Sequence, residues 1–381
     1  MRILFITNLY PPYHIGGYEI ACKDIAEGFR RRGHIVRVLT SIYGVDKPVM
    51  NDDAARLLDI TLKLNSRQSL FEKSSSLYFN STNYSITKSY IEDFAPDIVS
   101  FWSVNGISAS TIFAAEKKGI SKVFHLFDRS LSYLRKTGIK GVSNYLFFNR
   151  LNVKHLISSS SELKKDYVSR GFAEANIAVI PHGISIKEFA FKEKKTNRAL
   201  RLLYVGQLWE AKGVSVLLKA AGLLKKENVD FILTIIGKGE QSYVRFLHDV
   251  CKKENVADDV QFLGRVERQD LVNYYQENHV LVFPSIWKEP FGIVLLEAMA
   301  TGTPTITSKC GGPLDIVKDG RTGFFFESGD YKALASKILL FERSRNIISE
   351  MGHTARQTVL ERFDIKIVVN QIESLYSRIV N

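Results

Sequence analysis

Residues 280–307 read VLVF-PSIWKEPFG-IVLLEAMA-TGTP-TIT, and this stretch contains the pattern from which the fold can be inferred. A short apolar run, Val280–Phe283, precedes a proline-containing loop, and a helical pattern follows over Gly292–Ala300. Gly302 and Pro304 end that helix, and a second apolar run comes next. A strand, a helix and a strand at this spacing predict a parallel α/β sheet.

Short apolar runs of the same kind recur along the whole chain. In the first half they are Ile3–Thr7, Ile35–Thr40, Asp97–Trp102, Lys122–Phe127 and His155–Ser158. In the second half they are Leu202–Val205, Phe231–Ile236, Val260–Leu263, Val280–Phe283 and Thr305–Thr307. Helical patterns lie between these runs, notably at Tyr18–Arg32, Ile107–Lys118, Val214–Lys226, Tyr243–Glu254 and Gly292–Ala300. The chain is thus predicted to contain two doubly wound α/β halves in tandem.

A charged, turn-prone stretch, Ser185–Arg198, separates the two halves. It contains Lys192, Lys194 and Lys195 and little that we expect to be buried. A helix at the end of the chain carries an apolar stripe that needs a surface to pack on. We therefore predict domains over 1–184 and 185–364 and a final helix over 365–381. Ligands of open α/β sheets bind beyond the carboxyl ends of the strands, so two facing halves predict a cleft lined by strand-to-helix loops.

The composition is that of a folded protein with an acidic partner. A length of 381 residues suits two domains and exceeds one ordinary core. Apolar residues make up 45% and charged residues 24%, which excludes the disordered and fibrous classes. The 52 basic residues outnumber the 40 acidic ones and give a net charge of +12. This charge favours nucleic acid, an anionic membrane surface or a phosphorylated small molecule as a partner.

The cysteines and the N-terminus indicate a cytoplasmic protein. Cys22, Cys251 and Cys310 are few and widely spaced, which argues against a disulfide framework and a structural zinc site. The apolar run after Met1 is too brief for a signal peptide. No run reaches the roughly 18 apolar residues of a membrane span. Peripheral contact with the inner face of an anionic membrane stays open.

Three predicted strand-to-helix loops contain glycines that let the backbone approach an anion closely. They are Gly16-Gly17, the loop Gly206–Gly213, and Gly237–Gly239. Lys212 lies at the mouth of a helix in the second of these loops, a position that suits a phosphate. A tight turn would explain Gly16-Gly17 as well, and a solvated surface lysine would explain Lys212, so these loops alone do not fix the function.

Two glutamates accompany the opening stretch. Glu289 lies in the loop ahead of Pro290, and Glu297 lies about two turns into the apolar helix that follows. A carboxylate in an otherwise buried helix is unfavourable unless it is hydrogen-bonded. The hydroxyl pair of a sugar would satisfy Glu297, and so would a nearby lysine or a backbone amide.

These motifs resemble, in order, those of the large family of retaining glycosyltransferases with the GT-B fold, the family 4 or group 1 type. The matching series is Gly16-Gly17, His125, Gly206–Gly213, Gly237–Glu240, Glu289–Ala300, Gly302–Pro304, Gly311-Gly312 and Arg321–Gly323. It covers nearly the whole chain, and the two-glutamate motif is its most specific part. The resemblance implies two Rossmann-like domains facing across a cleft, with the last helix crossing back to the first domain.

The resemblance also implies a nucleotide-sugar donor, most readily UDP- or GDP-linked, held mainly by the second domain. The acceptor, a sugar, a lipid-linked molecule or another small molecule, would be held mainly by the first domain. The catalytic residues would be His125, Lys212 and Glu289. The donor-binding residues would be Gly16, Gly17, Gly206, Gln207, Lys212, Gly237, Lys238, Arg265, Val266, Glu289, Phe291, Gly292, Ile293 and Glu297. The acceptor-binding residues would be Tyr13, His14, Tyr18 and Asp128.

In these roles Glu297 would bind the ribose hydroxyls, Glu289 the hydroxyls of the transferred sugar, and Lys212 the diphosphate. His125 would hydrogen-bond a sugar hydroxyl or the departing oxygen. Negative charge develops on the departing diphosphate, so fixed positive groups stabilise the transition state. The chain contains no Asp-x-Asp pair, and we expect activity without a metal or another cofactor. No carboxylate pair is placed for double displacement, which favours same-face attack by the acceptor hydroxyl.

Two positions depart from the family pattern. Gln207 stands where the family usually has arginine, so one of two expected cations near the diphosphate is missing. Ser185 stands where the family usually has aspartate, shortly after His182-Gly183. The first departure puts the strength of leaving-group stabilisation in question.

The segment Leu131–Lys154 mixes aromatic and basic residues. This mixture suits an acceptor entrance or a membrane-surface helix, and an ordinary core-facing helix with a solvated basic face explains it as well.

Two other kinds of protein would fit the same residues. One is a sugar-nucleotide epimerase or phosphorylase, and the other, of a different class, is a basic nucleic-acid-binding protein. The basic residues are scattered and match no recognised nucleic-acid motif, so we expect no nucleic-acid partner. The sequence therefore predicts a hexosyl-type glycosyltransferase of bacterial polysaccharide or glycoconjugate biosynthesis.

Overall fold

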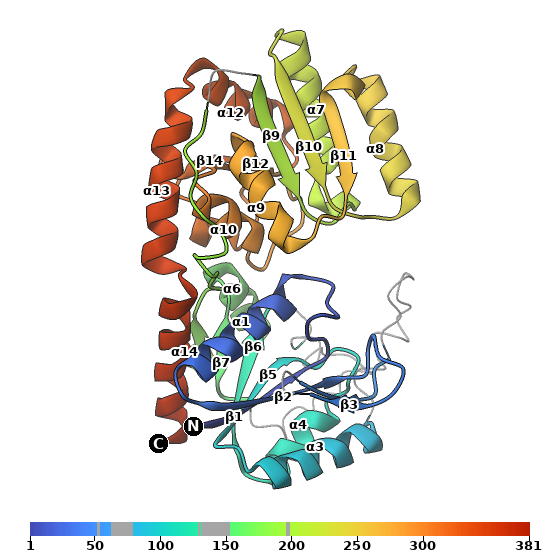
Figure 1. The fold of residues 1–381 in the computed structure, drawn as a ribbon, viewed down its shortest axis with the longest axis vertical. Helices are drawn as coiled ribbons and strands as arrows, with labels where there is room; N and C mark the ends of the chain where they lie inside the picture. The colour runs from blue at the N-terminus through green and yellow to red at the C-terminus, as the bar shows by residue number, and fades with distance from the viewer. Residues whose placement is uncertain (52–53, 62–78, 129–130, 132–152, 196–198) are drawn as a thin grey trace. The chain divides into compact units, whose positions relative to one another are not determined.

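The computed structural model describes residues 1–51, 54–61, 79–128, 131, 153–195 and 199–381. Internal contacts divide the chain into two compact units (Figure 1). The first unit comprises Met1–Gly183 and Ile365–Asn381, and the second comprises Ile184–Asp364. The junction lies next to the boundary drawn from the sequence, and the last helix groups with the first unit.

The first unit contains a mainly parallel sheet. Its strand order is β3-β4-β2-β1-β5-β6-β7-β8. The strands are β1 (Arg2–Thr7), β2 (Ile35–Ser41), β3 (Val49–Met50), β4 (Ala55–Leu58), β5 (Ile98–Ser103), β6 (Ser121–Leu126), β7 (Leu156–Ser158) and β8 (Ile177–Val179). Neighbouring strands run parallel except for β3 and β4. The predicted runs correspond to β1, β2, β5, β6 and β7, whereas the short strands β3, β4 and β8 were not predicted.

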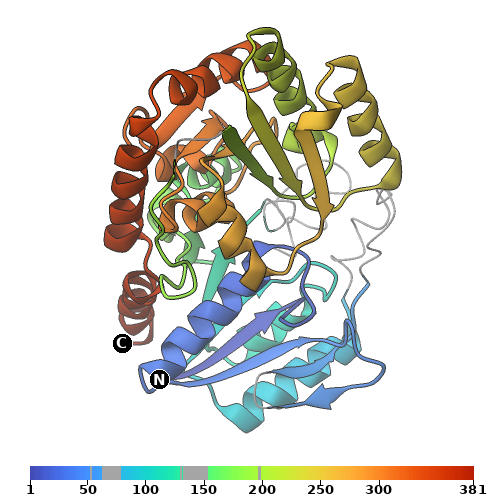
Figure 2. The ribbon, with the colours of Figure 1, turned by 45° about the horizontal axis from the view of Figure 1, so that its top comes forward.

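Helices cover both faces of this sheet. Leu4 and Ile6 belong to a core that includes buried residues of α3 (Ser81–Phe94), α4 (Ser110–Lys117) and α6 (Ser161–Ser169). Phe5 points the other way, because successive strand residues alternate between faces, and it contacts Phe29 of α1 (Gly17–Arg31) at 6.3 Å between ring centroids. The dark-blue α1 and the light-blue α3 lie on opposite sides of the sheet in Figure 2.

The last helix, α14 (Ile365–Val380), packs on α1 and β6 of the first unit. Its buried face comprises Ile365, Val368, Val369, Ile372 and Tyr376. Gly28 of α1 makes the close approach possible, since a Cβ there would lie 2.5 Å from Val369. Glu373 forms an ion pair of 2.6 Å with Arg32 and a hydrogen bond of 2.6 Å with His34 Nε2. The apolar stripe predicted for this helix is therefore the surface that joins the end of the chain to its beginning.

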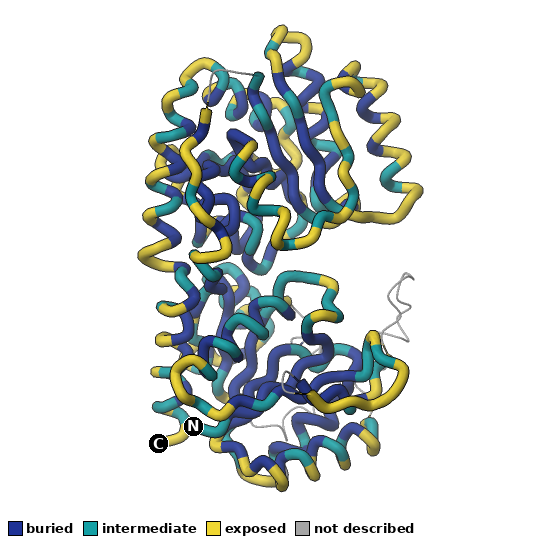
Figure 3. Tube along the Cα trace, in the orientation of Figure 1, coloured by how far each residue is buried: buried dark blue, intermediate teal, exposed yellow. Residues whose placement is uncertain are grey.

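The second unit contains a wholly parallel sheet with the order β11-β10-β9-β12-β13-β14. Its strands are β9 (Leu200–Val205), β10 (Phe231–Ile236), β11 (Val260–Gly264), β12 (Val280–Phe283), β13 (Thr305–Ser308) and β14 (Gly323–Phe326). All except β14 correspond to predicted runs. Most residues of β9, β10, β12 and β13 are buried, as expected for strands covered on both faces, whereas the edge strand β11 is only partly buried (Figure 3).

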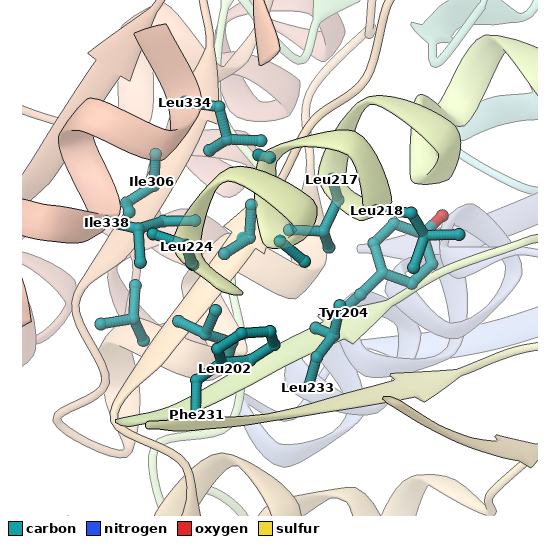
Figure 4. Packing of buried hydrophobic residues seen from close by; sticks show 14 of the residues in the cluster. Leu202, Tyr204, Leu217, Leu218, Leu224, Phe231, Leu233, Ile306, Leu334 and Ile338 are labelled. Atoms are coloured by element: carbon teal, nitrogen blue, oxygen red, sulfur yellow. The ribbon is translucent and has the colours of Figure 1, made fainter. Parts of the chain in front are cut away.

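Two cores flank the second sheet. One includes Leu202, Tyr204 and Leu233 of the strands and lies under α7 (Val214–Lys226), α8 (Gln241–Lys253) and α12 (Tyr331–Arg343) (Figure 4). The other includes Leu203 and Leu281 and lies under α9 (Arg268–Glu277), α10 (Ile293–Ala300) and α13 (Asn346–Arg362). The site described below is built from the loops that follow the carboxyl ends of these strands.

The expectation that Ser185–Arg198 buries little is wrong for its described part. Phe189 is fully buried in the second unit, and Lys194 is only 8% exposed. The burial of Lys194 was not predicted, because a lysine in a basic cluster is usually solvated. Residues 196–198 lie outside the described part of the chain.

No helix among the described residues is long and apolar enough to cross a membrane. Nearly all of Leu131–Lys154, the segment considered for membrane or acceptor contact, lies outside the described residues.

Truncation of the buried face of α14 is expected to destabilise the first unit. Ile372→Ala removes a side chain that is 1% exposed and should lower the free energy of unfolding by about 2–5 kcal/mol. Urea denaturation of the full chain measures this loss. Gln371→Ala, which changes the exposed neighbouring position, is the control and should have little effect. Equal effects of the two variants would contradict the packing of this helix.

Candidate functional site

Three loops meet at the carboxyl edge of the second sheet. They follow β9, β12 and β13, which are adjacent and parallel. The N–H groups of Ile286 and Trp287 both donate to the carbonyl of Ala211 at 2.9 Å, which joins the loops after β9 and β12. Glu289 N donates to Cys310 O at 3.1 Å, which joins the loops after β12 and β13. The loops thus form one hydrogen-bonded platform.

Close backbone contacts explain the glycines of these loops. Gly213 has φ +70°, and a Cβ there would lie 1.9 Å from the carbonyl oxygen of Pro284. Gly311 has φ +81°, and a Cβ there would lie 2.3 Å from the carbonyl oxygen of Glu289. Larger residues cannot be accommodated without moving a backbone.

Lys212 and Glu289, predicted as separate catalytic groups, form an ion pair. Lys212 Nζ donates to Glu289 Oε1 at 2.7 Å. Ser285 Oγ donates to the same oxygen at 2.6 Å. Glu289 is 7% exposed, and a carboxylate so buried requires such partners. Ser285 could not be recognised from the sequence, because serines are frequent in loops.

Glu297 is bound by a residue that the sequence analysis missed. It is the fifth residue of α10, closer to the start of the helix than expected, and is 5% exposed. The hydroxyl of Tyr275 on α9 donates to Glu297 Oε2 at 2.8 Å. Burial, with Glu297 beside it, raises the pKa of Tyr275 well above its usual value. The partner is therefore a phenol, not the lysine or backbone amide considered above, and only the tertiary structure reveals it.

The helix that carries Glu297 begins immediately after the predicted donor loop. Gly292 adopts φ +117° as the N-terminal cap of α10, and Ile293 is the first helical residue. Phe291 is buried in the core beneath this turn. The N-terminus of α10, with its partial positive charge, thus lies next to Glu289 in the chain.

The predicted glycine loops after β9 and β10 also lie together. A Cβ at Gly237 would lie 1.8 Å from the carbonyl oxygen of Gly206, and Leu208 N donates to Lys238 O at 2.8 Å. Tyr204 Oη donates to Gln207 O at 2.8 Å. The structure therefore brings the loop of Gln207 and the loop of Lys238 side by side.

The loop predicted to contact the nucleotide base follows β11. Gly237 N donates to Gly264 O at 2.7 Å, so this loop adjoins the glycine loops. Arg265 is exposed and pairs with Glu267 at 3.4 Å, and Val266 is partly buried. A cavity of about 560 Å³ opens nearby and is lined by Glu188, Phe189, Glu267, Arg268, Gln269 and Val272.

In the first unit, the Gly16-Gly17 loop is held by its own helix. Glu19 is fully buried and accepts the N–H groups of Gly16 at 3.1 Å and Ile15 at 3.2 Å. The N–H of Gly16 is therefore already hydrogen-bonded to a carboxylate in this structure, and contact of Gly16-Gly17 with a donor stays a prediction. Burial raises the pKa of Glu19.

The predicted acceptor residues lie around the same loop with partners of their own. Tyr18 donates to Asn8 Oδ1 at 2.7 Å, and Arg56 lies over the ring of Tyr13 at 5.1 Å. His14 hydrogen-bonds the carbonyl of Pro12 at 3.0 Å, and Asp128 accepts the hydroxyl of Tyr167 on its carbonyl.

His125 lies in a buried aromatic stack. Its ring stacks on Trp102 at 4.1 Å between centroids, and its Nε2 shares a hydrogen bond of 2.9 Å with the hydroxyl of Tyr376 on α14. Burial and nearby His182 lower the pKa of His125 to about 3, so this imidazole is neutral at physiological pH. This geometry is that of a structural histidine, and contact of His125 with a donor stays a prediction.

The steric role assigned to Gly213 can be tested against a matched glycine. Gly320 also has φ +70°, but a Cβ there would meet nothing within 4 Å. Gly320→Ala should lower the free energy of unfolding by only about 1–2 kcal/mol, the cost of left-handed backbone. Gly213→Ala adds the collision with Pro284 and should lower it by about 4 kcal/mol or more. Urea denaturation measures both, and equal losses would contradict the proposed backbone contact.

Comparison with known proteins identifies the family. The model of glycosyltransferase family 4 matches residues 15–188, and the model of glycosyl transferases group 1 matches residues 185–358. An uncharacterized glycosyltransferase of Methanocaldococcus jannaschii is 28% identical over 99% of this chain and 98% of that protein. The capsular polysaccharide biosynthesis glycosyltransferase CapM of Staphylococcus aureus is 28% identical over 59% of each chain.

Solved structures show the same architecture. Anabaena HepE, solved in complex with UDP, superimposes with a TM-score of 0.76 at 20% identity, over 99% of this chain and all of that chain. The parallel sheets of both units agree with the GT-B fold that the sequence predicted. With adjoining family models accounting for residues 15–358, the chain belongs to the GT-B glycosyltransferases of the family 4, group 1 type.

Proposed function

We propose that this glycosyltransferase moves a hexosyl group from a nucleoside-diphosphate sugar to an acceptor hydroxyl, with retention at the anomeric carbon and without a metal ion. The observation that carries the proposal is the platform of the second unit. Lys212, Glu289 and the start of α10 come together there, and the next residue of the motif, Glu297, is buried one helical turn away.

The comparisons support the donor class. HepE was solved with UDP and with UDP-glucose. The name of CapM places that relative in capsular polysaccharide biosynthesis, which supports glycan or glycoconjugate assembly as the context. We propose a UDP- or GDP-linked hexose as the donor of this chain and a sugar, lipid-linked or small-molecule hydroxyl as the acceptor.

The ion pair suggests how the leaving group is stabilised. An ammonium has three N–H donors, and Glu289 accepts one of those of Lys212. A diphosphate arriving beside Lys212 can accept another, and the negative charge that grows on it during bond cleavage strengthens that contact. Glu289, held by Ser285 as well, keeps an oriented carboxylate for the hydroxyls of the sugar.

Lys238 is a candidate to replace the arginine that the family usually has at the position of Gln207. Lys238 is exposed, and its loop is hydrogen-bonded to the loop of Gln207 through Leu208. We propose that Lys238 supplies the second positive charge near the diphosphate. Its flexible side chain suits a point contact with a phosphate oxygen.

Removal of the ammonium should slow turnover strongly. Lys212→Ala is expected to lower kcat about 100-fold or more, by analogy with the loss of one preorganised donor to a developing negative charge. Lys219→Ala changes an exposed lysine of α7 and serves as the control. Steady-state assays of nucleotide release with donor and acceptor provide the measurement. An unchanged kcat in Lys212→Ala would remove this residue from the mechanism.

The reaction class can be tested by product analysis. Each of UDP-, GDP- and ADP-hexose is incubated with and without acceptor glycosides, in buffer containing EDTA. We expect acceptor-dependent transfer that survives EDTA, and NMR of the product should show the anomeric configuration of the donor. A strict requirement for added divalent cation, an inverted product, or conversion of the donor sugar without acceptor would each contradict the corresponding part of the proposal.

A further inference from the structure

Lys194 is a buried lysine to which the proposed reaction gives no role. Its ammonium donates to the carbonyls of Tyr275 at 2.5 Å and Gln276 at 3.1 Å and to Thr303 Oγ1 at 2.7 Å. These contacts match the number of its N–H donors. Burial lowers the pKa of Lys194 to about 7, so three well-placed oxygens are needed to keep a charge here. Burial of a charged lysine is energetically unfavourable, so we expect Lys194 to have a specific role.

Two of the three oxygens that bind Lys194 are carbonyls of the last turn of α9. The last carbonyls of a helix lack partners within the helix and carry partial negative charge, which a buried cation satisfies. Thr303 Oγ1 donates to the carbonyl of Tyr275 at 2.7 Å as well. The main chain of Tyr275 is therefore held by both Lys194 and Thr303.

The side chain of Tyr275 connects this anchor to the candidate site. Tyr275 is fully buried, packs edge-to-face against Phe189 at 6.3 Å between centroids, and donates its hydroxyl to Glu297 Oε2. Its backbone is fixed at one end by Lys194, and its phenol binds the carboxylate at the other. Hydrogen bonds to the backbone and from the hydroxyl of Tyr275 thus link Lys194, in the segment that enters the second unit, to Glu297.

We propose that Lys194 and Tyr275 are positioning residues for Glu297 and that they set the selectivity of this site for a ribose over a deoxyribose. The inference rests on the proposed function, in which Glu297 binds the ribose hydroxyls of the donor. Neither residue needs to touch the ligand. With the phenol in place one carboxylate oxygen is fixed, and the orientation of the other oxygen toward a hydroxyl pair is fixed with it.

Nucleotide pairs that differ only in the ribose hydroxyls test the proposal. UDP, GDP and ADP are titrated into the full chain by calorimetry, and the one that binds most tightly is compared with its 2′,3′-dideoxy analogue. The variants are Tyr275→Phe, Lys194→Met and the double variant. Lys195→Met, at the exposed neighbouring lysine, is the control.

We expect Tyr275→Phe and Lys194→Met each to weaken the ribonucleotide about tenfold, the order of a hydrogen bond to a charged group. The affinity for the dideoxy analogue should stay the same, and the double variant should lose no more than the larger single loss, because both residues act through one path. Lys195→Met should bind like the wild type. If Lys194→Met does not fold, Thr303→Val replaces it and should weaken the ribonucleotide in the same direction, about threefold.

Several outcomes would overturn the inference. Unchanged ribonucleotide affinity in Tyr275→Phe would do so, and so would equal losses for the ribo and dideoxy nucleotides, which indicate general damage. Additive losses would show that Lys194 does not act through Tyr275. Equal wild-type affinity for both nucleotides would remove Glu297 from the ribose and leave the transferase proposal standing. A wild type that binds no nucleoside diphosphate would contradict the proposed function itself.

Discussion

The ion pair between Lys212 and Glu289 is the interaction on which the candidate site depends. The two side chains come from loops after neighbouring parallel strands, and the carbonyl of Ala211, beside Lys212, accepts two N–H groups of the second loop. A buried carboxylate without its cation would destabilise the loop, so the pair fixes the platform as well as its charge. The charge needed for a diphosphate is present before the ligand arrives, held in place by the group proposed to bind the sugar. Preorganisation of this kind avoids rearrangement during the reaction.

Buried polar groups in both units bind backbone rather than solvent. Glu19 closes the Gly16 loop in the first unit, and Lys194 closes the end of α9 in the second. His125 is joined to α14 through Tyr376, so the last helix contributes to the polar interior of the first unit. His125 was predicted to be catalytic and Lys194 to be solvated, and in the structure both are buried and hydrogen-bonded within their units. In the second unit these hydrogen bonds extend to Glu297 through Tyr275.

The fold could be predicted closely because most strands of both sheets are buried on two faces and stand out as short apolar runs. The runs that became β1, β5, β9, β10, β12 and β13 are of this kind. The short strands β3, β4 and β8 escaped prediction, since they offer few residues to a pattern. Ser185–Arg198 was misjudged for a different reason: its basic cluster resembles a solvated linker, and only the oxygens gathered from α9 and Thr303 show why Lys194 is inside.

The positions of the candidate-site residues could be predicted from the sequence, but their hydrogen-bond and ion-pair partners could not. Glycine loops and the two glutamates are recognisable because their spacing is fixed by strand-to-helix geometry. The partners depend on residues distant in sequence or on the direction of a side chain. Examples are the ion pair of Lys212 with Glu289, the hydrogen bond from Tyr275 to Glu297 and the hydrogen bond from Gly16 N to Glu19. None of these leaves a periodic signal in one sequence.

A crystal structure of the full chain with the nucleoside diphosphate that it binds most tightly tests the central claim most directly. The account predicts a diphosphate within hydrogen-bonding distance of Lys212 Nζ and the start of α7, and ribose hydroxyls on the carboxylate of Glu297. Nucleotide density elsewhere, with the Lys212–Glu289 platform empty, would contradict it.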